Sequence, residues 1–137
     1  MAYHSNESGR SEIYVRPFPA AGGTWQVSDN GGGFPTWSGD GKSIFYRTDE
    51  GVMVAAVDVS GGTFRVDKPE VLFKGSFRGG AQGMAVLGFA FPDYDVSAAT
   101  GDFVMFPESD QEGQGVHVNM ILNWGEELRR ILPPDRR

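Results

Sequence analysis

A four-residue turn, Ser38-Gly39-Asp40-Gly41, lies between the segment PTW and the apolar run IFY, and weaker copies of this unit flank it. Residues 44–48 (IFYRT) resemble residues 1–5 (MAYHS), 43 positions earlier, and residues 103–107 (FVMFP), 59 positions later. A unit of roughly 40–45 residues that reads as several short strands is typical of propeller blades. The longer second spacing predicts an insertion, which we assign to the Gly-rich residues 75–90.

Short runs of β-branched and aromatic residues alternate with glycine turns throughout the chain, a pattern that predicts strands. In the turn at residues 38–41, Asp40 is expected to accept hydrogen bonds from the turn backbone and Gly41 to supply a positive φ. The pattern predicts an all-β protein of about three antiparallel, four-stranded propeller blades, followed by a short C-terminal helix. The predicted parts are blades at residues 1–31, 32–75 and 91–123, the insertion, and a helical latch at 124–137. A generic β-sandwich is the alternative, although its units need not resemble each other.

Composition argues against several functional classes. The 137 residues carry a net charge of −6, which opposes binding to nucleic acid and to anionic membranes. The longest apolar run, residues 52–57, is far shorter than the ~20 residues of a membrane-spanning helix. The N-terminus lacks the basic and apolar regions of a secretory signal, so we expect a cytoplasmic protein. The chain has no cysteine, which excludes disulfides and thiolate metal sites.

Residues 34–46 (FPTWSGDGKSIFY) resemble the P-x-W-S-P-D-G-K-x-I-x-F repeat of TolB-like six-bladed propellers. Residues 5–10, 13–19, 94–97 and 122–128 are similar to the C-terminal propeller fused to bacterial serine/threonine protein kinases. The resemblance implies a propeller fold and a sensor or scaffold role, but no kinase motif accompanies it. The chain departs from the repeat at Gly39, where proline is usual. It departs again at residues 98–100 (AAT) in place of Pro-Asp-Gly, so the third turn is expected to lack Asp-Gly chemistry.

About half the blades of a six-bladed ring are present, and three blades cannot close around an axis because propellers typically have four to eight. Two copies related by a twofold axis would supply six blades with two identical junctions, so we expect a homodimer. The alternative is an excised fragment of a kinase-associated sensor propeller. The expected junction joins the first unit of one copy to the third unit of the other. It involves Tyr3, Ile13, Tyr14, Phe103, Met105, Val118 and Trp124.

The first strand of a blade is usually innermost, so side chains there are candidates for lining a central channel. On this basis the candidate binding residues are Trp37, Asp93, Tyr94 and Asp95, with the alternative that Trp37 packs between blades as a core residue. We therefore predict a non-catalytic module that binds a protein, a peptide or a small ligand. The rival is a hydrolase that uses the acidic residues of the channel, Asp93 or Asp95, or a histidine.

Catalytic and metal-binding patterns are weak in this sequence. The two histidines, His4 and His117, lie on predicted strands, and no Gly-x-Ser-x-Gly elbow accompanies them. The spacing of Asp93, Asp95 and Asp102 does not match a calcium-binding EF-hand loop. No metal site and no cofactor are expected.

Overall fold

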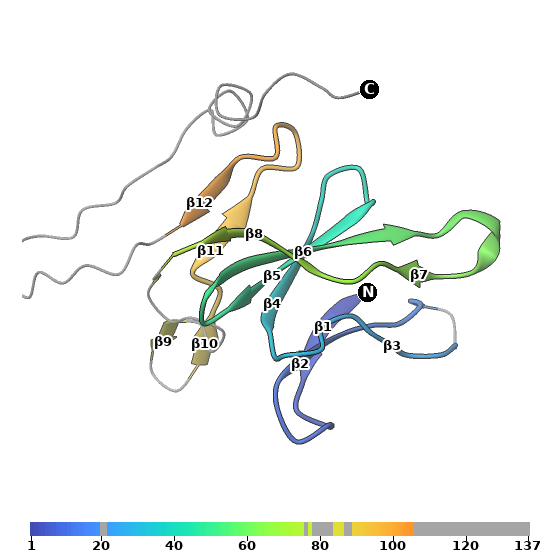
Figure 1. Cartoon of the computed structure of the whole chain (residues 1–137), viewed down its shortest axis with the longest axis horizontal. Helices are drawn as coiled ribbons and strands as arrows, with labels where there is room; N and C mark the ends of the chain where they lie inside the picture. The colour runs from blue at the N-terminus through green and yellow to red at the C-terminus, as the bar shows by residue number, and fades with distance from the viewer. Residues whose placement is uncertain (20–21, 76, 78–83, 87–88, 106–137) are drawn as a thin grey trace, which may run out of the picture.

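The computed structural model describes residues 1–19, 22–75, 77, 84–86 and 89–105. Within this part of the chain the regular elements are antiparallel β-strands and one short 3-10 helix, so the all-β prediction is confirmed (Figure 1). No helix among the described residues is long and apolar enough to cross a membrane. The predicted strand at 116–122 and helix at 124–132 lie outside the described residues, as do Val118 and Trp124.

The first sheet contains β1 (Ala2–Ser5), β2 (Glu12–Val15) and β3 (Trp25–Gln26), in the order β1-β2-β3. The buried carboxylate of Glu12 lies at the start of β2, the middle strand of this sheet. It accepts hydrogen bonds from the Ser28 hydroxyl, from Arg10 and from the Gly31 N–H. The Ser28 hydroxyl oxygen in turn accepts the Ile13 N–H at 2.7 Å. This network holds the loop after β3 against β2 without leaving the buried carboxylate unpaired.

The central sheet contains β4 (Gly33–Trp37), β5 (Ser43–Thr48), β6 (Gly51–Asp58) and β8 (Glu70–Lys74), paired in chain order. This is the four-stranded antiparallel meander expected for residues 32–75. The far end of β6 also pairs with β7 (Arg65–Val66), after the 3-10 helix η1 (Ser60–Gly62).

The third unit begins with the hairpin of β11 (Tyr94–Val96) and β12 (Phe103–Met105). A separate hairpin, β9 (Met84–Val86) with β10 (Phe89–Phe91), lies in the region that we predicted as a Gly-rich insertion. None of the sheets closes on itself within the described part of the chain.

The central sheet is covered on both faces. Successive residues of β5 point to opposite faces of the sheet, and those on each face pack into a different apolar cluster. Ile44 and Tyr46 belong to a cluster that includes Ile13 and Val15 of the first sheet. Phe45 packs instead on the opposite cluster, where its ring meets that of Phe103 at 5.1 Å. The first sheet and the β11–β12 hairpin therefore cover opposite faces of the central sheet (Figure 1).

The turn at residues 38–41 has the predicted chemistry. The Asp40 carboxylate accepts the Ser38 hydroxyl at 2.7 Å and the Lys42 N–H at 3.0 Å, and Gly41 has a φ of +70°. In the third unit residues 98–100 contain no Asp-Gly pair, and the turn is closed by the residues that follow them. Gly101 supplies a φ of +76° one position later, and Asp102 accepts the Thr100 hydroxyl.

These two turns pack against each other, which explains the departure at Gly39. A Cβ at Gly39 would lie 1.9 Å from the carbonyl oxygen of Ala98. A proline, or any residue with a side chain, therefore clashes with the backbone of the third-unit turn unless that turn moves.

Four residues expected at the dimer junction are instead covered by their own chain. Ile13 is fully buried, and Tyr14, Phe103 and Met105 are 6–7% exposed. Ile13, Phe103 and Met105 face the central sheet, so they are core residues here and leave no free surface for a partner.

Candidate functional site

A hollow of about 330 Å³ lies between β1 and β4 and opens to solvent. Its lining combines apolar side chains with two hydroxyls and one imidazole: Ala2, Tyr3, His4, Phe34, Pro35, Thr36 and Pro92. Pro92 directly precedes Asp93 and β11. The hollow therefore touches the leading strands of the first and central sheets and the residue before Asp93 at the start of the third unit.

The hollow follows the edges of strands rather than one face of a sheet. It contacts three consecutive residues of β1 and three consecutive residues of β4. Consecutive side chains of a strand point to opposite faces, so a single cavity that touches all three must border the backbone. Both strands lie at the end of their sheet order, which leaves their outer edges beside this cavity.

His4 and Phe34 form the polar part of the wall. The Nδ1 atom of His4 accepts the Phe34 N–H at 3.2 Å, and the two rings meet edge to face at 5.1 Å. Because Nδ1 acts as an acceptor, the neutral imidazole carries its proton on Nε2, which is then available as a donor. His4 is exposed, so this donor can reach a ligand in the hollow.

Phe34 has an unusual backbone conformation for a bulky residue, with a φ of +53°. Its N–H is held by His4, and its carbonyl oxygen accepts the Tyr94 hydroxyl at 2.5 Å. Strained backbone of this kind persists only where the surroundings fix it, and it is common at ligand clamps. The strain here is at a residue that lines the hollow.

Asp93, one of the predicted binding residues, is a buried partner of Arg47. Its two carboxylate oxygens accept hydrogen bonds from Nε and Nη2 of Arg47 at 3.1–3.3 Å, and neither side chain is exposed. The remaining guanidinium nitrogen, Nη1, donates to the carbonyl oxygens of Thr48 and Gly51. The Arg47 guanidinium also lies 5.1 Å from the centre of the Phe77 ring. Asp93 thus ties the third unit to the central sheet, and it does not face a ligand.

Tyr94 is also a core residue. Its hydroxyl donates to main-chain carbonyl oxygens of β4 and β5, at Phe34 and Phe45. Burial raises the pKa of the Tyr94 hydroxyl to about 12. A neutral hydroxyl between two carbonyl groups stabilises the contact between units and is a poor general base.

The structure does not gather the four predicted binding residues into one site. Trp37 packs on the cluster between the first and central sheets, whereas Tyr94 belongs to the cluster on the other face. Asp95 is exposed, and its carboxylate accepts the N–H of Val96 at 2.8 Å. Trp37 therefore takes the core position that its size suggested as the alternative.

Sequence reasoning missed the residues that line the hollow, apart from Tyr3 as a junction residue and His4 as a structural histidine. Two of the four Phe-Pro pairs in the sequence gave a partial signal, because Pro35 lies within β4 and Pro92 lies just before β11. Proline lacks an N–H and is confined to the edges or starts of strands, so Pro35 indicates that β4 is an edge strand.

Charged groups stand at both ends of β1. Arg16 is exposed and its guanidinium lies over the Tyr3 ring, 5.6 Å from the ring centre. Glu7 follows the other end of β1 and is also exposed. The described residues contain no group of three histidine or acidic side chains placed to hold a metal ion.

Comparison with models of protein families, with curated proteins and with solved structures found no match.

Proposed function

We propose that this chain is a non-catalytic, TolB-like propeller module that binds a protein, a peptide or a small ligand in the hollow between β1 and β4. The observation that carries the proposal is the convergence of three leading segments on one cavity: β1, β4 and Pro92 before β11. Its volume of about 330 Å³ is at the lower end of the ~300–1,000 Å³ typical of ligand sites. Apolar walls with a few polar groups, here Thr36 and His4, are the usual lining of such sites.

The arrangement of the sheets supports the propeller part of this proposal. The first sheet, the central sheet and the β11–β12 hairpin follow one another through space in chain order. The central sheet, which is the middle one, is covered on both of its faces. The turns of the second and third units are closed by matching hydrogen bonds, Ser38 N–H to Ser43 and Ser97 N–H to Asp102, both at 2.9 Å. Neighbouring blades of a propeller pack face to face in this way, whereas a two-sheet sandwich has no sheet covered on both faces.

We also propose that two copies complete a six-bladed ring, and that the residues that meet lie on the outer faces of the first sheet and of the β11–β12 hairpin. Tyr3 is opposite Tyr14 in the first sheet, on the face away from the inward-pointing Ile13. In the β11–β12 hairpin, Asp95 is opposite Val104 on the face away from the central sheet. A junction would therefore bring Tyr3 and Arg16 of one copy to Asp95 and Val104 of the other.

Light scattering across micromolar dilution tests the dimer, for which we expect twice the chain mass of 14.9 kDa. Arg16→Glu should weaken the dimer, and Arg16→Glu combined with Asp95→Arg should restore it. A well-folded monomer at every concentration contradicts the ring.

Ligand binding is tested by NMR and thermal-shift screening of peptides and small polar compounds. Thr36→Arg fills the hollow and should abolish binding, while the matched substitution Thr63→Arg, at an exposed position outside the lining, should leave binding unchanged. Hydrolysis of an ester, peptide or glycoside that is lost in Asp95→Asn, an exposed position, would overturn the non-catalytic assignment.

A further inference from the structure

We infer that the outer edge of β1 is a strand-addition site, at which an extended segment of a partner protein pairs with the main chain of Ala2 and His4. The inference deepens the proposed binding function and rests on it, because the segment would place its side chains in the same hollow. It specifies the class of ligand as protein backbone in β conformation.

The hydrogen-bonding pattern leaves the correct groups facing outward. Met1 and Arg16 exchange main-chain hydrogen bonds at 2.8 and 3.0 Å. Antiparallel pairs alternate between bonded and non-bonded positions, so Tyr3 bonds to its partner and Ala2 and His4 do not. Ile13, opposite His4, indeed directs its N–H and carbonyl to Ser28 and Val27 on the other side of β2. The N–H and carbonyl groups of Ala2 and His4 therefore point to the open edge of β1.

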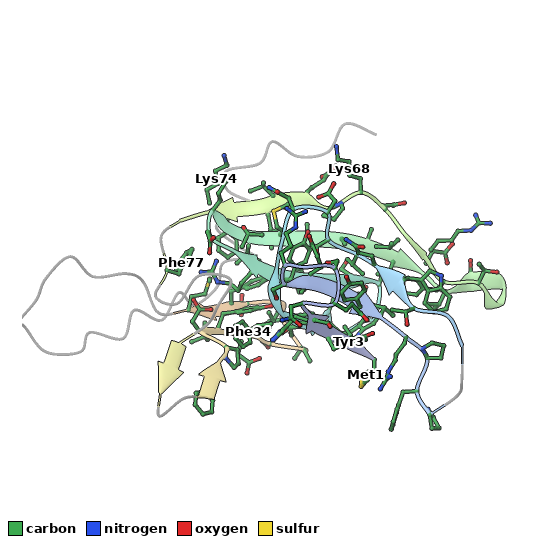
Figure 2. All side chains as sticks on the ribbon, turned by 90° about the horizontal axis from the view of Figure 1, so that it is seen from below. Met1, Tyr3, Phe34, Lys68, Lys74 and Phe77 are labelled. Atoms are coloured by element: carbon green, nitrogen blue, oxygen red, sulfur yellow. The ribbon has the colours of Figure 1, made fainter. Side chains whose placement is uncertain are left out.

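Other edges near the hollow are less suited to pairing. On β4, Pro35 has no N–H to donate, and the Phe34 N–H already binds His4. Figure 2 shows Lys68 and Lys74 on the side of the molecule away from Met1, Tyr3 and Phe34. Lysines of this kind protect an edge strand such as β8 from pairing. Within the described residues, no strand pairs with the outer edge of β1, and neither proline nor lysine interrupts it.

The charges around the site favour one kind of occupant. The hollow is also lined by β4 and Pro92, so a segment paired with β1 would contact the central sheet and the residues before β11 as well. Antiparallel addition is the more stable arrangement, and it places the C-terminal end of the segment beside Met1 and Arg16. Charge complementarity then favours a segment with an acidic residue at that end and a basic residue near Glu7.

The test uses the full chain and the acetylated, amidated peptide KTVTVTE, whose charges match this orientation. We expect NMR shift changes at the Ala2 and His4 amides and slower hydrogen exchange at both. The charge-swapped peptide ETVTVTK should bind about two- to fivefold more weakly, the size expected for an exposed ion pair. Methylation of alternate peptide nitrogens, which removes the pairing N–H groups, should abolish binding.

Two matched protein variants separate main-chain pairing from simple filling of the hollow. Ala2→Pro removes an outward N–H without touching the bonded positions Met1 and Tyr3, and it should abolish peptide binding. Ala2→Gly keeps the N–H and should bind as the wild type does. If Ala2→Pro does not fold, the N-methylated peptide on the wild-type chain decides the question.

Two outcomes overturn the inference: no binding of KTVTVTE, or equal binding of the methylated peptide. In either case, other ligands that enter the hollow and are excluded by Thr36→Arg would leave the proposed binding function standing. If no ligand of any class enters the hollow, the proposed function fails as well.

Discussion

Removing the carboxylate of Asp93 should be the most damaging single change in the described part of the chain, and it should act through stability rather than binding. Asp93→Ala leaves the Arg47 guanidinium buried without its counter-ion, since neither residue is exposed. Breaking a buried ion pair from one side typically costs about 3–5 kcal/mol. Folded domains are stable by only about 5–15 kcal/mol, so this loss is a large fraction of the total.

Different substitutions of Asp93 should reduce the free energy of unfolding by different amounts, depending on which hydrogen bonds of Arg47 they remove. Asp93→Asn keeps the shape and an acceptor oxygen but removes the charge, so we expect a loss of about 1.5–3 kcal/mol, the range for hydrogen bonds to charged groups. Nη1 of Arg47 retains its bonds to Thr48 and Gly51 in either variant. Asp95→Asn is the matched control. It is exposed and should change the free energy of unfolding by no more than about 0.5 kcal/mol.

Urea denaturation followed by tryptophan fluorescence, at one fixed protein concentration, gives these free energies. The double variant Arg47→Met/Asp93→Leu removes both charges and should be more stable than Asp93→Ala, because apolar pairs often replace buried ion pairs without loss. The reasoning is refuted if Asp93→Ala unfolds within about 1 kcal/mol of the wild type, or if the double variant is the least stable of the set.

The turns and Tyr94 give four smaller predictions. Gly39→Ala should cost about 1–3 kcal/mol in urea denaturation by forcing apart two turns, and Ala98→Gly should not rescue it, because the contact atom is a carbonyl oxygen. An added Cβ at Gly41 would contact no neighbouring atom, so Gly41→Ala should reduce the free energy of unfolding by only about 1–2 kcal/mol, because of the positive φ. A larger loss of stability for Gly41→Ala than for Gly39→Ala would contradict the contact between the two turns. Hydrogen bonds from the Ser38 hydroxyl and then the Lys42 N–H lower the pKa of Asp40 below 3.8. Its stabilising contribution is therefore present above that pH and lost as pH falls through the folded-state pKa, so Asp40→Ala and wild-type stabilities should converge in acid. Burial raises the pKa of Tyr94 from 10.0 to about 12, so stability should hold below pH 10 and fall as pH rises toward 12. Tyr94→Phe should reduce that fall while costing about 0.5–1.5 kcal/mol at neutral pH, and an unchanged alkaline slope would argue against the burial.

The sequence by itself determined the features that depend on neighbours along the chain. Strand and turn residues predicted the all-β class and the meander of β4, β5, β6 and β8. The Ser38 to Gly41 turn followed from local hydrogen bonding and from the freedom of glycine to adopt positive φ. These properties need only a few adjacent residues, so a single sequence contains the information.

Only the tertiary structure decided which side of each strand faces which neighbour. In Ile44-Phe45-Tyr46 every residue is apolar because both faces of the central sheet are covered, so no polar alternation marks an outward face. The same ambiguity placed Ile13 and Phe103 at a junction when they belong to the core.

Contacts between distant residues were equally invisible in the sequence. Arg47 and Asp93 are 46 positions apart, and a lone aspartate before a strand looks the same whether it meets a ligand or a buried arginine. The hollow is bounded by backbone edges of β1 and β4, and such an edge has no residue type of its own. Its position is fixed by how the sheets stack, which is a property of the packed core rather than of any local segment.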